Sequence, residues 1–231
     1  MILISFDGLQ AKYLHEYGYP LSTTPNLDGF LDKSYLFLKA KSAAPWTVPS
    51  HMSVMTSMYP SEHKVVNKFT QYDSETKKGV TSNLNKLTPN AITLAQVLKQ
   101  NGYTTGGFTG DAGVTGIFGF NQGFDTYFDK QTFGGFDQSV PRALEWLKKN
   151  KDKRFFMFLH GYDVHGQHAP VGGFDYRYVE KPYKGKYTGS PKEQGTLREE
   201  GLKNGVLNLS AEDIKFWRAV YDEKINRVDT E

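Results

Sequence analysis

The 231-residue sequence predicts an α/β fold, with a mainly parallel sheet flanked by helices on both faces. Three short runs, residues 1–6, 104–110 and 154–160, have the length and the β-branched or aromatic content of strands. Segments with helical periodicity separate these runs along the chain. Strands that alternate with helices usually pair in parallel, because each helix carries the chain back across the sheet.

The first apolar run ends at Asp7, which we expect at the carboxyl end of a buried strand. Ligands of open α/β sheets bind at that end of the strands. A lone aspartate at such a position more often only turns the chain. Both interpretations of Asp7 remain open from this stretch alone.

Helices are predicted at three places in the first half of the chain. Residues 24–37 carry apolar side chains at helical spacing, and a short helix that begins near Pro49 is closed by Pro60. The clearest helix lies within residues 90–103, where Asn90 can serve as the N-cap and Gly102 follows the helix end. These helices would pack against the sheet.

The second half predicts two more helices. One covers residues 137–150, with Ser139 as its cap and Pro141 in its first turn. The last opens with a capping pattern, Ser210 followed by Asp213. Its apolar side chains share one face: Ile214, Trp217, Tyr221, Ile225 and Val228.

Residues 1–231 are expected to form a single domain, with a long polar loop over residues 166–209 that is either functional or mobile. An apolar helix face needs a sheet to cover, and few strands are predicted. The final helix also has no C-cap. We therefore expect this chain to be the front part of a larger catalytic domain.

Composition excludes several classes of protein. A formal charge of +3 with dispersed basic residues does not favour a nucleic-acid surface. With no cysteine, disulfides and thiolate metal sites are impossible, so any metal must have oxygen and nitrogen ligands. No signal peptide and no membrane span is predicted, and the compartment stays unknown.

Two further stretches carry candidate chemistry. "APWTVPSH", residues 44–51, places Thr47 before a predicted helix start, where threonine is usually an N-cap. "HGYDVHGQH" brings together His160, Asp163, His165 and His168 at a strand end. Such a density of carboxylate and imidazole favours a metal or oxyanion site over a packing role.

Together with Asp7, these stretches support one mechanism. A threonine hydroxyl is a poor nucleophile at neutral pH, so Thr47 needs a base or a metal that stabilises its alkoxide. The N-terminus of a helix would attract an anion beside it. His165 would bind an oxygen of the transferred group or protonate the leaving group. This combination fits phosphoryl or sulfuryl transfer.

The order of the motifs resembles the sulfatase-like branch of the alkaline phosphatase superfamily. "ILISFDGLQAKYLHEYGY", "TPNLDGFL", "APWTVPSHMSVMTSMYPSEHKV", "TLAQVLKQNGYTTGGFTG", "GFNQGFDTYF" and "RFFMFLHGYDVHG" carry the resemblance, which covers essentially the whole chain. It implies that Asp7 is a metal ligand and that Thr47 is both nucleophile and metal ligand. It also implies that His165 contacts the phosphate or sulfate and that Asp163 is a ligand of a second metal.

Two departures from the family pattern shape the functional hypothesis. At the nucleophile, sulfatases carry a motif that resembles Cys-x-Pro-Ser-Arg, and its cysteine, or sometimes serine, is oxidised to formylglycine. Thr47 cannot be converted to formylglycine. His51 stands in place of the arginine, so the block looks like threonine-using phosphodiesterases and phosphotransferases. We include His51 and His160 among the expected substrate-binding residues. The family's Asp-His pair after the last helix would complete the metal site.

The resulting hypothesis is a metal-dependent hydrolase or transferase that acts on phosphate mono- or diesters through a covalent threonine intermediate. The cofactor would be a divalent metal, either zinc, calcium, magnesium or manganese, without formylglycine. The substrate would be a small-molecule, glycan-linked or lipid-linked phosphate or sulfate ester. Two alternatives remain: a sulfuric ester hydrolase without formylglycine, and an inactive family member or fragment with a binding role.

Overall fold

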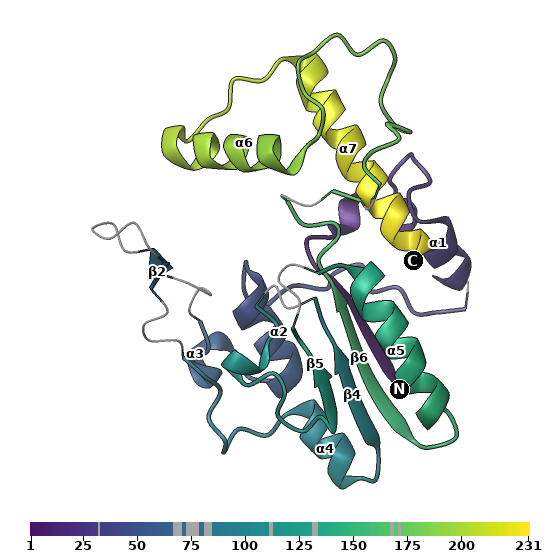
Figure 1. Ribbon diagram of the computed structural model, residues 1–231, viewed down its shortest axis with the longest axis vertical. Coiled ribbons are helices and arrows are strands. Elements are labelled where there is room, and N and C mark those ends of the chain that lie inside the picture. The colour runs from purple at the N-terminus through teal and green to yellow at the C-terminus, as the bar shows by residue number, and fades with distance from the viewer. Residues whose placement is uncertain are drawn as a thin grey trace. The chain divides into compact units, whose positions relative to one another are not determined.

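The computed structural model describes residues 1–31, 33–66, 71–72, 79–80, 85–110, 113–130, 134–166, 169–170 and 172–231 (Figure 1). Its internal contacts divide the chain into two compact units. Unit 1 comprises Met1–Ser5 and Lys39–Gly161, and unit 2 comprises Phe6–Leu38 and Tyr162–Glu231. Each unit therefore combines an early segment of the chain with a later one.

The sheet contains four strands in the order β1 (Ile2–Phe6), β6 (Phe155–Gly161), β4 (Thr104–Phe108) and β5 (Thr126–Phe128). Strand β4 pairs in parallel with both β5 and β6. At the β1 edge of the sheet, Met1 N donates to the Phe155 carbonyl, and the Met1 carbonyl accepts from Met157 N. This pattern of hydrogen bonds indicates that β1 and β6 run parallel. The predicted mainly parallel α/β sheet is thus confirmed.

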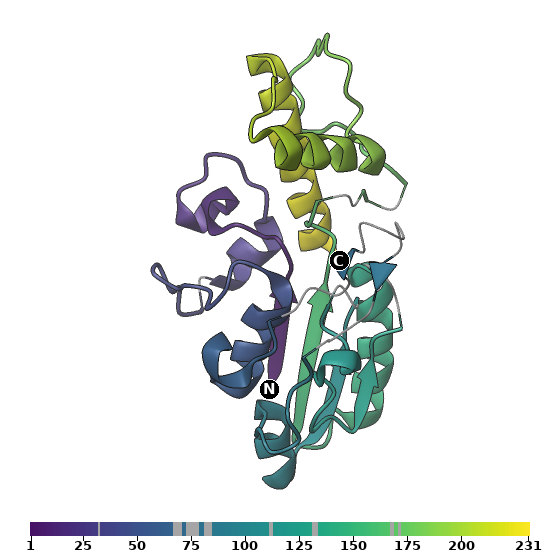
Figure 2. The same ribbon diagram turned by 90° about the vertical axis from the view of Figure 1, so that its left-hand side faces the viewer.

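Helices cover both faces of this sheet, and Figure 2 shows α2 (Thr47–Thr56) and α5 (Phe136–Asn150) on opposite sides. Strand β6 alternates its side chains accordingly. Phe156 and Phe158 belong to the core with the buried methionines of α2, whereas Phe155 meets Trp146 of α5. A Cβ on Gly106 would lie 2.8 Å from the Trp146 ring, so this strand position accommodates glycine alone.

The remaining elements of unit 1 are short. They are α3 (Pro60–His63), α4 (Leu94–Gln100), the turn η3 (Gly116–Phe118) and an antiparallel pair formed by β2 (Gln71–Tyr72) and β3 (Gly79–Val80). Neither β5 nor this pair was expected from the sequence. In the described residues, no helix has the length and apolar character needed to cross a membrane.

Three helix starts differ from the sequence-based expectation. Helix α2 begins at Thr47 instead of near Pro49. Helix α4 is capped by Thr93 and not by Asn90, because the Thr93 hydroxyl accepts from Gln96 N while the Gln96 side chain accepts from Thr93 N. Helix α5 begins at Phe136, with Gly135 as its N-cap. Ser139, the predicted cap, and Pro141 therefore lie inside the helix.

Unit 2 is built around α7 (Ala211–Thr230), and its other elements are α1 (Pro25–Leu31), α6 (Pro191–Asn204) and the turns η1 (Ala11–Tyr13) and η2 (His15–Tyr17). The predicted capping box of α7 is confirmed, since Ser210 Oγ accepts from Asp213 N at 3.0 Å. Asp229 near the other end of α7 accepts from Asn26 N and Leu27 N, both at 2.8 Å. Those are N–H groups of the first turn of α1.

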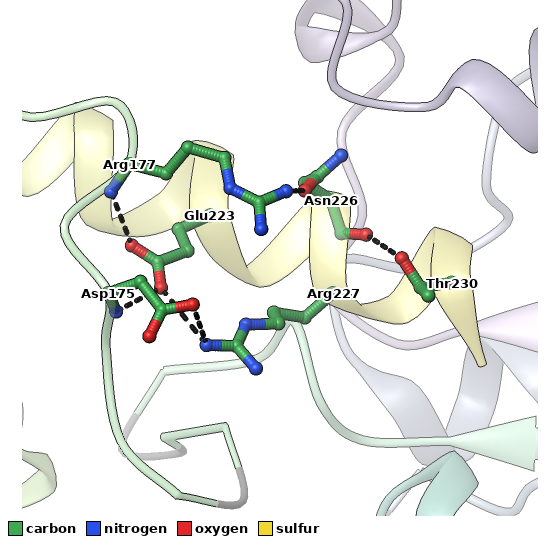
Figure 3. Close-up of polar contacts among 6 residues, drawn as sticks. All are labelled: Asp175, Arg177, Glu223, Asn226, Arg227 and Thr230. Carbon is green, nitrogen blue, oxygen red and sulfur yellow. Dashed lines mark hydrogen bonds and ion pairs between the residues drawn. The ribbon is translucent and has the colours of Figure 1, made fainter.

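The stretch 166–209, expected as loop, contains the 14-residue helix α6. Ser190, Pro191 and Glu193 start this helix with a capping box, and Gly205 ends it in the left-handed region. Residues 175–177, which precede α6, are hydrogen-bonded to α7. Figure 3 shows buried Glu223 of α7 accepting hydrogen bonds from the backbone N–H groups of Asp175 and Arg177.

Candidate functional site

Thr47 is the first residue of α2, and Trp46 before it is the N-cap, with an extended backbone (φ −143°, ψ 165°). Thr47 is half-buried, and the next two residues are buried. The N–H groups of a helix's first turn have no intrahelical acceptor and carry the positive end of the helix dipole. The Thr47 side chain therefore projects from a helix end that favours negative charge, without being the cap itself.

A chain of hydrogen bonds runs from β6 through β1 to the first turn of α2. His51 Nδ1 lies 2.9 Å from the carbonyl oxygen of Thr47, which can only accept. His51 Nε2 therefore accepts, and Ser5 Oγ donates to it at 2.6 Å. Ser5 Oγ in turn accepts from His160 Nδ1 at 3.3 Å. We call Ser5, His51 and His160 the relay.

Burial keeps the His160 ring of the relay neutral. His160 has 0 % exposure, and burial lowers its pKa well below the usual value, with a further contribution from His51. The two rings pack edge to face with centroids 5.0 Å apart. Because each ring donates through Nδ1, the tautomer of both histidines is determined by their partners.

In unit 2, the loop after β1 packs on the loop after β6. Gly8, with φ +78°, lies so close to His165 that a Cβ on it would be 3.0 Å from the His165 Cα. Asp7 precedes this glycine, and Asp163 lies two residues before His165. Both carboxylates are half-buried. The loops that follow these two strands therefore approach each other closely at Gly8 and His165.

The His165 ring is held by two contacts. It stacks on Tyr162 with centroids 4.1 Å apart, and its Nδ1 donates to the Gly166 carbonyl at 3.0 Å. Burial, reinforced by the negative charge of Asp7, raises the pKa of Tyr162. With Nδ1 engaged, Nε2 of His165 is the nitrogen that can exchange a proton with a ligand.

The predicted site residues thus form two groups. Thr47, His51 and His160 belong to unit 1, and Asp7, Asp163 and His165 belong to unit 2. Within the described residues, no group of three or more histidine, aspartate or glutamate side chains is close enough to hold a metal ion. His168 lies outside the described residues.

Sequence reasoning missed Ser5 and Lys224. Ser5 joins the two relay histidines, although a serine inside an apolar strand gives no local signal of such a role. Lys224 is 4 % exposed, and its Nζ donates to the His165 carbonyl at 2.9 Å. The sequence did offer one signal for Lys224, because this lysine lies among the apolar residues of the last helix.

A search of protein-family models matches residues 1–230 to the family described as Sulfatase. Among curated proteins, the human bis(5'-adenosyl)-triphosphatase ENPP4 is 34 % identical over 79 residues. That alignment covers 34 % of this chain and 16 % of the relative, so it spans only a small part of that protein.

Solved structures share the fold at low sequence identity. The phosphonate monoester hydrolase of Agrobacterium radiobacter is 17 % identical with a TM-score of 0.66, and the match covers 99 % of this chain and 56 % of that one. The periplasmic domain of EcEptC from Escherichia coli, in complex with Zn, is 18 % identical with a TM-score of 0.56, at 99 % and 56 % coverage. This chain therefore spans little more than half the length of these two structures.

Proposed function

Since the chain belongs to the sulfatase family, we propose that its parent protein is a metal-dependent hydrolase or transferase of phosphate esters that forms a covalent intermediate on Thr47. The proposal includes His165 as the residue that contacts the transferred group. Its substrate would be a small-molecule, glycan-linked or lipid-linked ester. The curated relative's name specifies a triphosphate substrate, which supports phosphorus over sulfur.

The observation that carries the proposal is the setting of Thr47. A hydroxyl at the first turn of a 10-residue helix is next to N–H groups that stabilise an anion. His51 donates to the carbonyl of the same residue at 2.9 Å, which restrains the backbone that carries the nucleophile. Thr47 cannot be converted to formylglycine, so the nucleophile in this proposal is the threonine hydroxyl itself.

In the first step, Thr47 Oγ1 attacks phosphorus while the bond from phosphorus to the leaving oxygen breaks. The leaving oxygen takes a proton from Nε2 of an imidazolium at His165, and the Thr47 proton passes to water. In the second step, water or an acceptor alcohol attacks phosphothreonine and gives its proton to Nε2 of His165, while Thr47 Oγ1 leaves and takes back a proton from water. Atoms and charge balance with one ester bond exchanged in each step.

Asp7 and Asp163 are the described carboxylates proposed to hold a divalent metal, together with the Thr47 oxygen. Their loops are joined through the Gly8–His165 contact, and hard oxygen donors suit such an ion. When bound, the metal would lower the pKa of the Thr47 hydroxyl and neutralise charge on phosphate. The Zn-bound structural neighbour agrees with a divalent ion, whose identity we leave open.

The test is mass spectrometry of the parent protein, quenched in acid during turnover of bis(p-nitrophenyl) phosphate. We expect a phosphate adduct on Thr47 and none on the Thr47→Val variant, which keeps the β-branched shape. Thr56→Val, which removes a hydroxyl at the other end of α2, is the matched control. Undiminished turnover by Thr47→Val would refute the proposal.

Sulfate ester hydrolysis is the second candidate, and the matched family name favours it. A sulfated threonine lacks the easy elimination that a formylglycine hydrate provides. We therefore expect higher kcat/KM for an aryl phosphodiester than for an aryl sulfate in a side-by-side assay of one preparation. The opposite order would favour the sulfatase activity.

A further inference from the structure

A cavity of about 340 Å³ lies in unit 2 along one face of α7. Trp217, Tyr221 and Lys224 are three or four residues apart on this helix and so share that face. The rest of the lining comes from two loops, α6 and α7: Gly8, Gln10, Val164, His165, Gly166, Gln194 and Val220. We call this space the Lys224 cavity, and its volume is within the range of small-ligand sites.

Lys224 brings a buried positive charge to this cavity. Its ammonium donates to the carbonyl of His165 and to Oε1 of Gln194, both at 2.9 Å. Gln194 is oriented for this by donating its Nε2 to the Gly189 carbonyl at 2.7 Å. An ammonium has three N–H donors, and the third has no acceptor among the described residues.

No carboxylate balances this charge within the described part of the chain. The cavity lining contains neither aspartate nor glutamate, and the described ion pairs do not include Lys224. Burying an ammonium without a counter-charge is costly. Burial lowers the pKa of Lys224 to about 8, and no neighbouring charge contributes to that change.

Trp217 supplies a second donor that lacks a partner. Its indole Nε1 is buried and has no hydrogen-bond acceptor among the described residues. Tyr221, between the two on the helix face, is already satisfied, because its hydroxyl donates to Gly8 O at 2.7 Å and accepts from Gln10 N at 3.0 Å. The cavity is thus lined by an unbalanced cation, which calls for an anionic acceptor, and by a tryptophan whose N–H is itself buried away from the cavity.

We propose that the Lys224 cavity binds a second oxyanion of the substrate, a phosphate or carboxylate on the part that is not transferred to Thr47. The inference rests on the proposed function, because the cavity includes His165, the residue proposed to contact the transferred group. The preferred substrate is then an ester whose leaving group is itself anionic. Lys224 would select that group by its positive charge.

The test follows the indole N–H signals of the ¹⁵N-labelled chain during titration with sodium pyrophosphate, at ionic strength held constant with sodium chloride. The sequence has 3 tryptophans, so the Trp217 signal is the one missing from Trp217→Phe. We expect this signal to move and saturate, because Trp217 lines the cavity that the anion enters, while the other two stay in place. Parallel titration with citrate distinguishes a phosphate site from a carboxylate site.

Lys224→Met should weaken pyrophosphate binding at least tenfold. Lys215→Met is the matched control, since Lys215 lies on the same helix with a side chain 65 % exposed. Should Lys224→Met not fold, Lys224→Gln removes the charge while keeping a donor for the His165 carbonyl. Equal weakening by Lys215→Met, or a Trp217 signal that neither pyrophosphate nor citrate moves, would overturn the inference.

The same titration on Thr47→Val separates this inference from the proposed function. If no phosphothreonine forms in the parent protein yet the Trp217 signal still saturates, the cavity is an anion site and the proposed reaction fails. If phosphothreonine forms but the Trp217 signal does not respond, the reaction stands and the cavity proposal fails.

Discussion

The Ser5 hydroxyl joins two histidine rings, His51 and His160, by hydrogen bonds. It donates to His51 at 2.6 Å and accepts from His160 at 3.3 Å, so a single oxygen determines the tautomers of two imidazoles. His51 in turn restrains the backbone of Thr47. The residue next to the proposed chemistry is thus held by a hydrogen-bond chain whose far end is fully buried.

Replacing Ser5 with alanine should destabilise the protein by about 1–3 kcal/mol, because a buried donor and an acceptor lose their partner together. Urea unfolding followed by circular dichroism measures the change. Ser61→Ala, at an exposed position of the same unit, should alter stability by no more than about 0.5 kcal/mol. A Ser5→Ala midpoint equal to that of Ser61→Ala would mean that the relay contributes nothing to stability.

At the scale of elements, sequence reasoning succeeded where a signal was local. The Ser210–Asp213 capping box lies within four residues and was predicted. The cap of α1 comes from Asp229, 203 residues from Asn26, which no local pattern can indicate. Helix α6 was missed because its exposed sequence has few apolar residues, although its capping box and final glycine were readable.

Removing the remote cap should loosen α1. In Asp229→Ala, the N–H groups of Asn26 and Leu27 lose the carboxylate that accepts from both, at a cost of about 1–2 kcal/mol. Hydrogen exchange at these amides should accelerate at least tenfold, while the amides of α5 keep their rates. Asp152→Ala, at an exposed turn, serves as the control and should leave both regions unchanged.

Replacing Glu223 should likewise loosen residues 175–177, which precede α6 and are hydrogen-bonded to Glu223. Its two carboxylate oxygens accept from Asp175 N at 2.6 Å and Arg177 N at 3.1 Å, and glutamine retains an acceptor for only one of them. Glu223→Gln should therefore speed tryptic cleavage after Arg177 several-fold. Exposed Glu199→Gln is the control, and equal cleavage rates in the two variants would contradict the role assigned to Glu223.

For the whole molecule, buried neutral histidines link stability to pH. Burial lowers the pKa of His63 and of His160, so below about pH 6.5 the unfolded chain binds protons that the folded chain does not. Stability is then full above that pH and falls on acidification. His63 Nδ1 accepts from Val65 N at 3.0 Å, and protonation would break that bond.

Between pH 7.0 and 5.5, His63→Gln should reduce the pH dependence of the free energy of unfolding by up to about 1.4 kcal/mol per pH unit. Urea titrations at several pH values give this slope. Gln100→Asn, which alters an exposed side chain that carries no titratable group, should leave the slope unchanged. A slope for His63→Gln equal to that of the unmodified protein would show that His63 does not titrate differently on folding.

The α/β class, the strand ends and the motif positions followed from local periodicity, so they were predictable. The relay and the Lys224 cavity were not, because each depends on residues far apart in sequence that only tertiary contacts bring together. Ser5 and His160 are 155 positions apart, and Lys224 and His165 are 59 apart. The roles of Asp7, Thr47, Asp163 and His165 in catalysis remain predictions.

The remote cap of α1 also has a consequence in time. On the ribosome, residues 6–38 emerge early, yet Asn26 waits 203 residues for the aspartate that caps its helix. At synthesis rates of about 5–20 residues per second, that delay is roughly 10–40 s. During that interval the first turn of α1 lacks the carboxylate that later caps it, so its N–H groups are open to solvent or to a nascent-chain chaperone.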